Sequence, residues 1–270
     1  MKKFQSIIAI VITIVLAIGL IGCGTKNTAD IKSGQPEAKN VTLTVSAAAS
    51  LKDAMEEIKT LYSQEKPGVT ITYNFGASGS LQQQIEQGAD VDVFLSAATK
   101  QMDALKVKGL ILDDTRKDFL KNDIVLVIPK DSSLIADFKD LTNANVKKFA
   151  LGEPKSVPAG QYGQEVLTKL NLMDAIKSKV VYGKDVREVL TWVETGNADA
   201  GIVYGTDAKT SAKVKTVATA SEDSHTPVLY PAAVIKASKN VDAAKDFINF
   251  LYSDKAKPVF EKYGFVFVAK

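Results

Sequence analysis

From residue 41 onward, the hydrophobic positions switch repeatedly between a two-residue period and a period of three to four residues. Residues 41–45 alternate and are β-branched at most positions, which predicts a strand. From Leu51 to Tyr62 the apolar residues recur at helical spacing, and Pro67 with Gly68 ends this predicted helix. The first predicted unit is therefore a strand that passes into a helix across small residues.

The same alternation continues toward the C-terminus. Because strands that alternate with helices form parallel sheets covered by helices on both faces, the pattern predicts an α/β fold. So many strands would crowd a single sheet, so we expect two lobes, each a mainly parallel sheet flanked by helices. Further strands are predicted at residues 69–75, 90–95, 122–129, 149–154, 180–182, 198–205 and 214–219, and further helices at residues 81–88, 99–108, 158–170, 185–196 and 241–251, and residues 257–265 close the fold.

Several strand-to-helix junctions carry groups that can donate hydrogen bonds to an anion. Ser50 is predicted as the N-cap of the first helix with Asp53 in capping-box position, and Ser80 with Gln83 repeats the pattern. A proline at the first position of the helix at 158–170 leaves the N–H of Ala159 free. Ligands in α/β folds bind at the carboxyl ends of strands, where helix N-termini attract negative charge. An anion site is therefore expected at these junctions.

Two later segments add further donors. Asp185 is predicted as an N-cap whose box Glu188 completes, so the N–H of Val186 is exposed. Tyr204 ends a buried strand, and its hydroxyl either serves a ligand or bonds a neighbouring backbone group in the core. The serines at the earlier junctions likewise either bind a ligand or only cap their helices.

The N-terminus has the features of an exported lipoprotein. A basic start, an apolar run and the sequence Leu20-Ile-Gly-Cys23 predict a signal peptide at residues 1–22, resembling a bacterial lipobox in which Cys23 is lipidated. Residues 23–40 are polar and contain almost no large apolar side chain, which predicts a flexible tether. We therefore expect a protein anchored by lipid on the extracytoplasmic face of the cell membrane.

Composition excludes several classes of function. The formal net charge is +3, and two of these charges lie at Lys2 and Lys3, so nucleic-acid binding has no basic stripe to rest on. Cys23 and His225 are the only residues of their types, which argues against zinc sites, Ser–His–Asp triads and any direct metal-ion ligand set. No cofactor motif appears. The chain offers binding groups and lacks catalytic ones.

Asp90 and Asp92 are the remaining candidates for chemistry. They alternate along a predicted strand and so share one face, which leaves a carboxylate-based hydrolase formally open. We favour the simpler interpretation that they are charges at a strand entrance that cap their neighbours.

Taken together, these segments resemble the molybdate-binding proteins of bacterial ABC transporters. The resemblance covers roughly residues 41–267, in the order of that family, and the combination is specific although each motif alone is weak. It rests on Ala47-Ala-Ala-Ser-Leu-Lys-Asp-Ala-Met55, Phe75-Gly-Ala-Ser-Gly-Ser-Leu81, Asp92-Val-Phe-Leu-Ser96, Gly152-Glu-Pro-Lys-Ser-Val-Pro-Ala-Gly160, Asp185-Val-Arg187, Gly201-Ile-Val-Tyr-Gly-Thr-Asp-Ala208, Glu222-Asp-Ser-His-Thr-Pro227 and Tyr263-Gly-Phe265.

The resemblance implies a type II periplasmic-binding-protein fold whose two lobes close on the ligand. It places one lobe at residues 41–121 plus 231–270 and the other at residues 122–230. It also implies that two serines, two backbone amides and a tyrosine hydroxyl hold the oxyanion. One departure is Gly79, where some relatives carry another serine. By motif, the ligand-binding positions are Ser50, Ser78, Ala159, Val186 and Tyr204.

The function that this resemblance implies is capture of molybdate or tungstate by a monomer that delivers it to an ABC permease, without an enzyme activity or a cofactor. Backbone N–H groups and rotating hydroxyls suit a dianion that carries no proton, so we expect no carboxylate to contact the ligand. Two alternatives stay open: a receptor for sulfate or phosphate on the same fold, and the carboxylate-based hydrolase.

Overall fold

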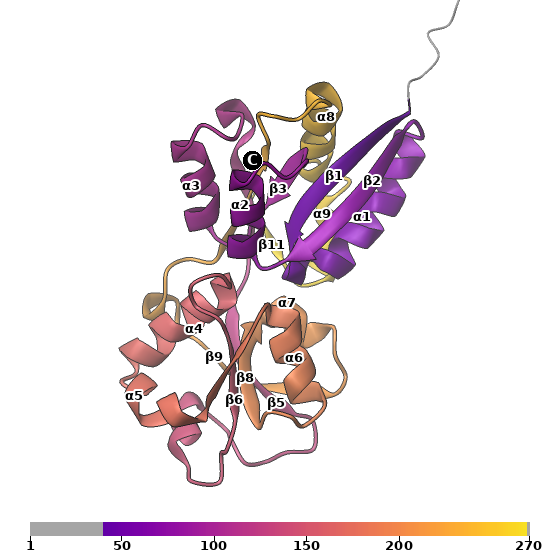
Figure 1. The fold of residues 1–270 in the computed structure, drawn as a ribbon. Coiled ribbons are helices and arrows are strands. Elements are labelled where there is room, and N and C mark those ends of the chain that lie inside the picture. Colours follow the sequence, from indigo (N-terminus) through magenta and orange to yellow (C-terminus); the bar gives the residue numbers. More distant parts are fainter. Residues whose placement is uncertain (1–39, 269–270) are drawn as a thin grey trace, which may run out of the picture. The chain divides into compact units, whose positions relative to one another are not determined.

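The computed structural model describes residues 40–268 and arranges them as two sheets flanked by helices (Figure 1). The predicted signal peptide, Cys23 and nearly all of the tether lie outside the described residues. None of the described helices is long and apolar enough to cross a membrane. We call the first sheet with its helices the first lobe and the second sheet with its helices the second lobe.

The sheet of the first lobe has the strand order β11-β4-β10-β3-β1-β2. Parallel pairing joins β1 to β2 along its whole length, from Val41 opposite Val69 to Ala48 opposite Gly76. Because that pairing holds the two strands in register, the loops after them emerge at the same edge of the sheet. The strands are β1 (Val41–Ala48), β2 (Val69–Gly76), β3 (Val93–Leu95), β4 (Lys117–Lys121), β10 (Leu229–Val234) and β11 (Val266–Phe267).

The sheet of the second lobe has the order β7-β6-β8-β5-β9. Strand β5 is buried from Ile124 to Ile128, as expected for a continuous apolar strand covered on both faces. The strands are β5 (Ile124–Pro129), β6 (Phe149–Gly152), β7 (Val180–Gly183), β8 (Ala200–Tyr204) and β9 (Val214–Thr219).

The α/β class with two helix-flanked sheets is confirmed, but the expectation of mainly parallel sheets is wrong. Parallel pairs join β1 to β2 and β3, and β6 to β7 and β8. Strands β4, β5, β9 and β10 pair antiparallel with all of their neighbours. These four strands flank the two passages of the chain between the sheets, and their direction makes both sheets mixed.

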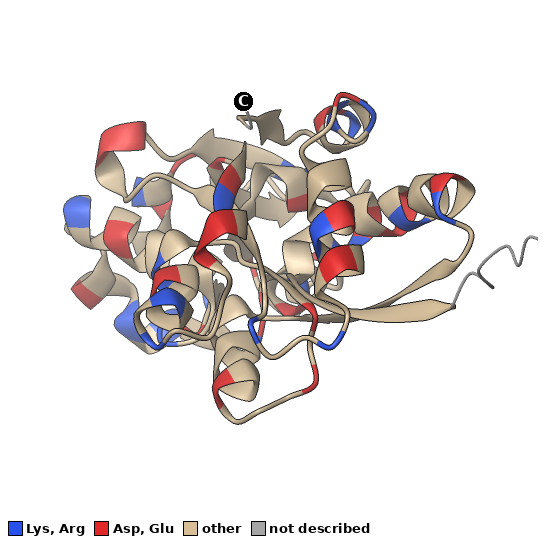
Figure 2. Cartoon of the chain, turned by 90° about the horizontal axis from the view of Figure 1, so that it is seen from above, with Lys and Arg blue, Asp and Glu red and all other residues tan. Residues whose placement is uncertain are grey.

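Helices cover both sheets, with α1 lying along β1 and β2 in Figure 1. Charged residues of both signs are interspersed over the helices, while the central strands carry few (Figure 2). The helices are α1 (Lys52–Glu65), α2 (Ser78–Glu86), α3 (Thr99–Val107), α8 (Val241–Leu251) and α9 (Lys257–Lys262) in the first lobe, and α4 (Pro158–Lys169), α5 (Met173–Ile176), α6 (Val186–Glu194) and α7 (Gly205–Lys209) in the second.

Two of the predicted caps are wrong. Ser50 lies inside a 3₁₀ turn, η1 (Ala49–Leu51), that precedes α1, and its hydroxyl contacts Tyr230 instead of the helix. Helix α2 begins at Ser78, which places Ser80 within its first turn, and no side chain caps it. Counted from Ala49 and Ser78, the two helical segments start two and three residues earlier than their hydrophobic pattern indicates, because small residues carry the first turn.

The cap of α6 is as predicted in its main part. The side chain of Asp185 accepts the N–H of Glu188 at 2.9 Å. The carboxylate of Glu188 accepts the N–H of Lys184 and not that of Asp185, so the box closes one residue further out.

The division into lobes near residues 121/122 and 230/231 stays a prediction. The strands of the first sheet end at Lys121 and resume at Leu229, and β5 opens the second sheet at Ile124. Tyr230 therefore lies on a strand of the first sheet.

Candidate functional site

One small cavity lies between the two lobes, at the ends of strands from both sheets. It has a volume of about 10 Å³, far below the roughly 300–1,000 Å³ of pockets that hold drug-sized ligands, so it suits a small ion at most. All five residues named from the sequence line it. The complete lining is Ala48, Ala49, Ser50, Gly76, Ala77, Ser78, Ala97, Val157, Pro158, Ala159, Asp185, Val186 and Tyr204.

The first lobe contributes two buried hydroxyls. Ser50, in η1 after β1, is 3% exposed and lies 3.0 Å from the hydroxyl of Tyr230. Ser78, the first residue of α2, is fully buried, and its Oγ accepts the N–H of Ala97 at 2.9 Å. Because β1 and β2 are paired in register up to their last residues, these two serines are brought together on the same side of the cavity.

The second lobe contributes backbone N–H groups. Ala159 is the second residue of α4 and Val186 is the first residue of α6. The N–H groups in the first turn of a helix have no partner within that helix, and they carry its positive dipole end. Pro158 has no N–H of its own, so Ala159 carries the first free N–H of α4.

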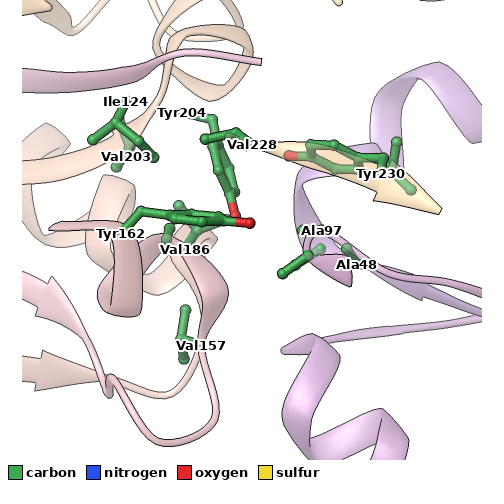
Figure 3. Close-up of a cluster of buried hydrophobic side chains, with 14 of the residues drawn as sticks. Ala48, Ala97, Ile124, Val157, Tyr162, Val186, Val203, Tyr204, Val228 and Tyr230 are labelled. Carbon is green, nitrogen blue, oxygen red and sulfur yellow. The ribbon is translucent and has the colours of Figure 1, made fainter. Parts of the chain in front are cut away.

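Tyr204 supplies a buried hydroxyl at the cavity, near the hydroxyl of Tyr230. Its side chain is 1% exposed, and its Oη has no hydrogen-bond partner. Burial raises the pKa of Tyr204 well above its ordinary value, so the phenol stays protonated and able to donate. In Figure 3 this hydroxyl points away from Ile124 and Val203, in the direction of Val186 and the hydroxyl end of Tyr162. The alternative of a core tyrosine bonded to a neighbouring backbone group is therefore wrong.

The cavity lining contains neither lysine nor arginine. Asp185 is the one carboxylate among the lining residues, and its Oδ1 accepts the N–H of Glu188 as the cap of α6. The expectation that no carboxylate contacts the ligand stays a prediction. Among the described residues, no group of three or more His, Cys, Asp or Glu side chains is placed to hold a metal ion.

Direct contacts join the lobes beside the cavity. The N–H of Gly79 on α2 donates to the carbonyl of Ser156, at 2.9 Å, in the loop before α4. A Cβ at Gly79 would lie 2.6 Å from that carbonyl oxygen, so only glycine allows this approach. Arg187 on α6 pairs with Asp53 on α1 at 2.6 Å and with the buried Asp207 of its own lobe at 2.6 Å.

Asp90 and Asp92 do not contribute to the cavity. Asp90 is exposed at the surface. Asp92 is buried at the entrance of β3 and accepts bonds from the N–H of Thr44, from Ser238 and from Asn240. The interpretation of Asp92 as a cap for its neighbours is confirmed, and its oxygens are occupied by these structural donors.

Sequence reasoning missed three residues that support the site. Ala97 bonds Ser78, and Tyr230 bonds Ser50 and Asn122. Tyr230 lies on β10, which the pattern did not predict because Pro231 interrupts it. The structure accommodates that proline at a register shift between Tyr230 and Pro231. The signal that could have found this strand is its apolar run on either side of the proline.

Comparisons with known proteins place these features in context. Residues 43–266 match the family described as bacterial extracellular solute-binding proteins. Bacillus subtilis YvgL, described as a substrate-binding lipoprotein of an ABC transporter, is 47% identical over 98% of both chains. The molybdate-binding protein ModA of Haemophilus influenzae is 42% identical over 84% of this chain and 91% of its own. A solved substrate-binding domain, described as part of a molybdenum ABC transporter from Clostridium difficile, is 54% identical, with a TM-score of 0.66 over 84% of this chain and 99% of that chain.

Proposed function

This chain belongs to the family of bacterial extracellular solute-binding proteins, and we propose that it captures molybdate, and tungstate as well, and delivers the ion to an ABC permease. The observation that carries the proposal is the convergence of uncharged donors on one small cavity. They comprise three hydroxyls and two helix-start N–H groups, on Ser50, Ser78, Tyr204, Ala159 and Val186.

A fully deprotonated tetrahedral dianion fits these groups because it presents acceptors only. Each hydrogen bond to a charged group contributes about 1.5–3 kcal/mol, and each helix N-terminus adds about 0.3–1 kcal/mol. A handful of such bonds, less the cost of removing water and of bringing the lobes together, supports binding in the sub-micromolar range, about 8 kcal/mol or more. No positive side chain is needed in the lining for this balance to hold.

We propose that Cys23 carries a lipid that anchors the protein, as a monomer, on the extracytoplasmic face of the membrane. The support is the sequence around Cys23 and the lipoprotein description of YvgL, which matches over 98% of both chains. Metabolic labelling with a radioactive fatty acid tests this. Label should enter the wild-type protein and be absent from Cys23→Ala, and label in both would overturn the assignment.

A receptor for sulfate or phosphate is the second candidate, since the same donors serve any tetrahedral oxyanion. Isothermal titration of one purified sample with molybdate, tungstate, sulfate and phosphate decides between them. We expect tight binding of the two metalates and much weaker binding of the smaller anions. Sulfate binding as tightly as molybdate would overturn the assignment of the ligand.

The position of the site is tested in the same experiment. Ser50→Ala and Ser78→Ala each remove one hydroxyl from the cavity, and we expect each to weaken molybdate binding by roughly tenfold or more. Ser63→Ala, in the exposed part of α1, is the matched control, because its Oγ bonds only the carbonyl of Thr60. Unchanged affinity in both cavity variants would place the ligand elsewhere.

A further inference from the structure

A chain of buried hydrogen bonds leads from the passage between the lobes to Ser50. Asn122, between β4 and β5, directs its Nδ2 at the Oγ1 of Thr206 at 2.8 Å and at the Oη of Tyr230 at 3.2 Å. The Oη of Tyr230 lies 3.0 Å from the Oγ of Ser50. The Oδ1 of Asn122 accepts the N–H of Asp123 at 2.9 Å, which fixes the orientation of the amide. All four linked side chains are at most 5% exposed.

The direction of each bond follows from the number of protons available. An amide nitrogen carries two protons and no acceptor, so Asn122 donates to both Thr206 and Tyr230. Tyr230 therefore receives a proton at its oxygen and must direct its own proton elsewhere. Ser50 is the other polar partner of that hydroxyl, so Tyr230 donates to Ser50. In the reverse direction neither of the two groups hydrogen-bonded to Tyr230 would accept its buried proton, which is costly.

Ser50 consequently has its own proton free for the cavity. Ser78 is held in the same way from a different side, because its Oγ already accepts the N–H of Ala97. Each serine oxygen thus accepts a hydrogen bond from a donor of the protein, and each serine hydroxyl can donate its proton to the ligand. The backbone of Ala97 fixes the direction for Ser78, whereas the side chains of Asn122 and Tyr230 fix it for Ser50.

We infer that Asn122 and Tyr230 are positioning residues that orient the Ser50 hydroxyl as a donor and so make the site reject an oxyanion that carries a proton at that position. The inference rests on the proposed function and deepens it, because it names the groups that set the selectivity. A protonated oxygen facing Ser50 would meet the proton of that hydroxyl, while Tyr230 already uses one of the two lone pairs of the serine oxygen. Monohydrogen phosphate, which is also a dianion, is the probe that carries such a proton.

Tyr230→Phe tests the inference directly. It removes the donor to Ser50 and leaves that hydroxyl free to rotate, so it can accept a proton from the ligand. In mildly alkaline buffer, where phosphate is mostly the monohydrogen dianion, molybdate and phosphate affinities are measured by titration, with phosphate followed by displacement. We expect the molybdate-to-phosphate affinity ratio to fall by roughly tenfold, through weaker molybdate binding and equal or stronger phosphate binding.

Asn122→Asp is the second variant, and it reverses the direction of the hydrogen bonds that lead to Ser50. A carboxylate at this position accepts a hydrogen bond from the hydroxyl of Tyr230. The oxygen of Tyr230 then accepts a hydrogen bond from the hydroxyl of Ser50, and a lone pair of the serine oxygen faces the cavity. The added negative charge weakens all dianions alike, so the affinity ratio remains the readout. We expect the ratio to fall at least as far as in Tyr230→Phe.

Tyr73→Phe is the matched control, because it removes a tyrosine hydroxyl of the same lobe that donates to the carbonyl of Met55. It should leave the ratio unchanged. A purely structural role of Tyr230 would lower both affinities by the same factor, and an unchanged ratio in Tyr230→Phe and Asn122→Asp overturns the inference. Failure of the wild-type protein to bind molybdate would instead overturn the proposed function, so the two failures are distinguishable.

Discussion

The hydroxyl of Tyr204 is a buried donor that the folded protein itself does not satisfy. Such a group costs about 1–3 kcal/mol when it is left unpaired, and a bound oxyanion would remove that cost. We expect Tyr204→Phe to unfold no more easily than the wild type without ligand, and to bind molybdate more weakly by roughly tenfold or more. Thermal unfolding without ligand and titration with molybdate measure the two effects.

The control for this prediction is Tyr73→Phe, whose hydroxyl has a partner in the carbonyl of Met55 at 2.8 Å. It should lower the melting temperature and leave molybdate affinity unchanged. A Tyr204→Phe protein that melts below the wild type by as much as this control would show that the hydroxyl serves the fold and not a ligand.

Asp207 gives a pH dependence that is opposite to that of most carboxylates. Burial raises its pKa to about 6 from an ordinary 3.8, even though Arg187 acts to lower it. The folded state therefore binds this proton more tightly than the unfolded state. The resulting stability is fully present below a pH of about 4 and is lost as the pH rises through about 6.

Asp207→Asn cannot titrate, so we expect its unfolding free energy to increase relative to the wild type as the pH rises from about 4 to about 6. Urea unfolding of both proteins across this range measures the difference. A difference that is constant with pH would contradict the raised pKa.

Among the elements, those with a strong hydrophobic periodicity have the bounds that the sequence predicts. The predicted bounds of β9 and α8 agree with the structure at Val214–Thr219 and Val241–Leu251. The predicted helix at 81–88 begins earlier, at Ser78, because glycine and serine carry its first turn without an apolar signal. Strand β10 escaped prediction because Pro231 lies inside it, where only a register shift makes a proline tolerable.

The hydrogen-bond donors of the candidate site can be predicted from the sequence, but the residues that hold those donors in place cannot. The family resemblance gives Ser50, Ser78, Ala159, Val186 and Tyr204, and all five line one cavity. Their own partners, such as Ala97 for Ser78, come from segments that are distant in sequence and carry no motif. Side-chain direction across a sheet edge depends on tertiary packing, which single-sequence patterns do not encode.

Helix α6 offers a prediction about its cap, because Asp185 both caps the helix and lines the cavity. Asp185→Ala removes the bond to the N–H of Glu188 and should cost about 0.5–2 kcal/mol of stability. Asp185→Asn keeps a capping oxygen without the charge, so it should retain that stability and bind the dianion at least as tightly as the wild type. Chemical unfolding and molybdate titration measure the pair, and equal destabilisation by both would contradict the role as a cap.

For the whole molecule, the approach of the two lobes depends on Gly79. A side chain there would push against the carbonyl of Ser156, because its Cβ would lie 2.6 Å from that oxygen. Overpacking of this kind costs about 1–3 kcal/mol. We expect Gly79→Ala to weaken molybdate binding by that amount while the melting temperature without ligand stays close to that of the wild type, because lobes that separate relieve the clash.

The control for Gly79→Ala is Gly205→Ala, since no atom lies closer than 3.8 Å to a Cβ at that position. It should leave the affinity unchanged. Molybdate binding by Gly79→Ala that equals the wild type would mean that the lobes need not come this close around the ligand.

The burial of the cavity has a consequence for timing. Each of the five lining residues named above is at most 4% exposed, and the contacts of Gly79 with Ser156 and of Arg187 with Asp53 join the two lobes beside them. An ion held there cannot leave by diffusing past loose side chains. Its residence time is therefore governed by how often those contacts between the lobes break. A transporter that separates the two lobes would release the ion without needing a site of higher affinity than the cavity.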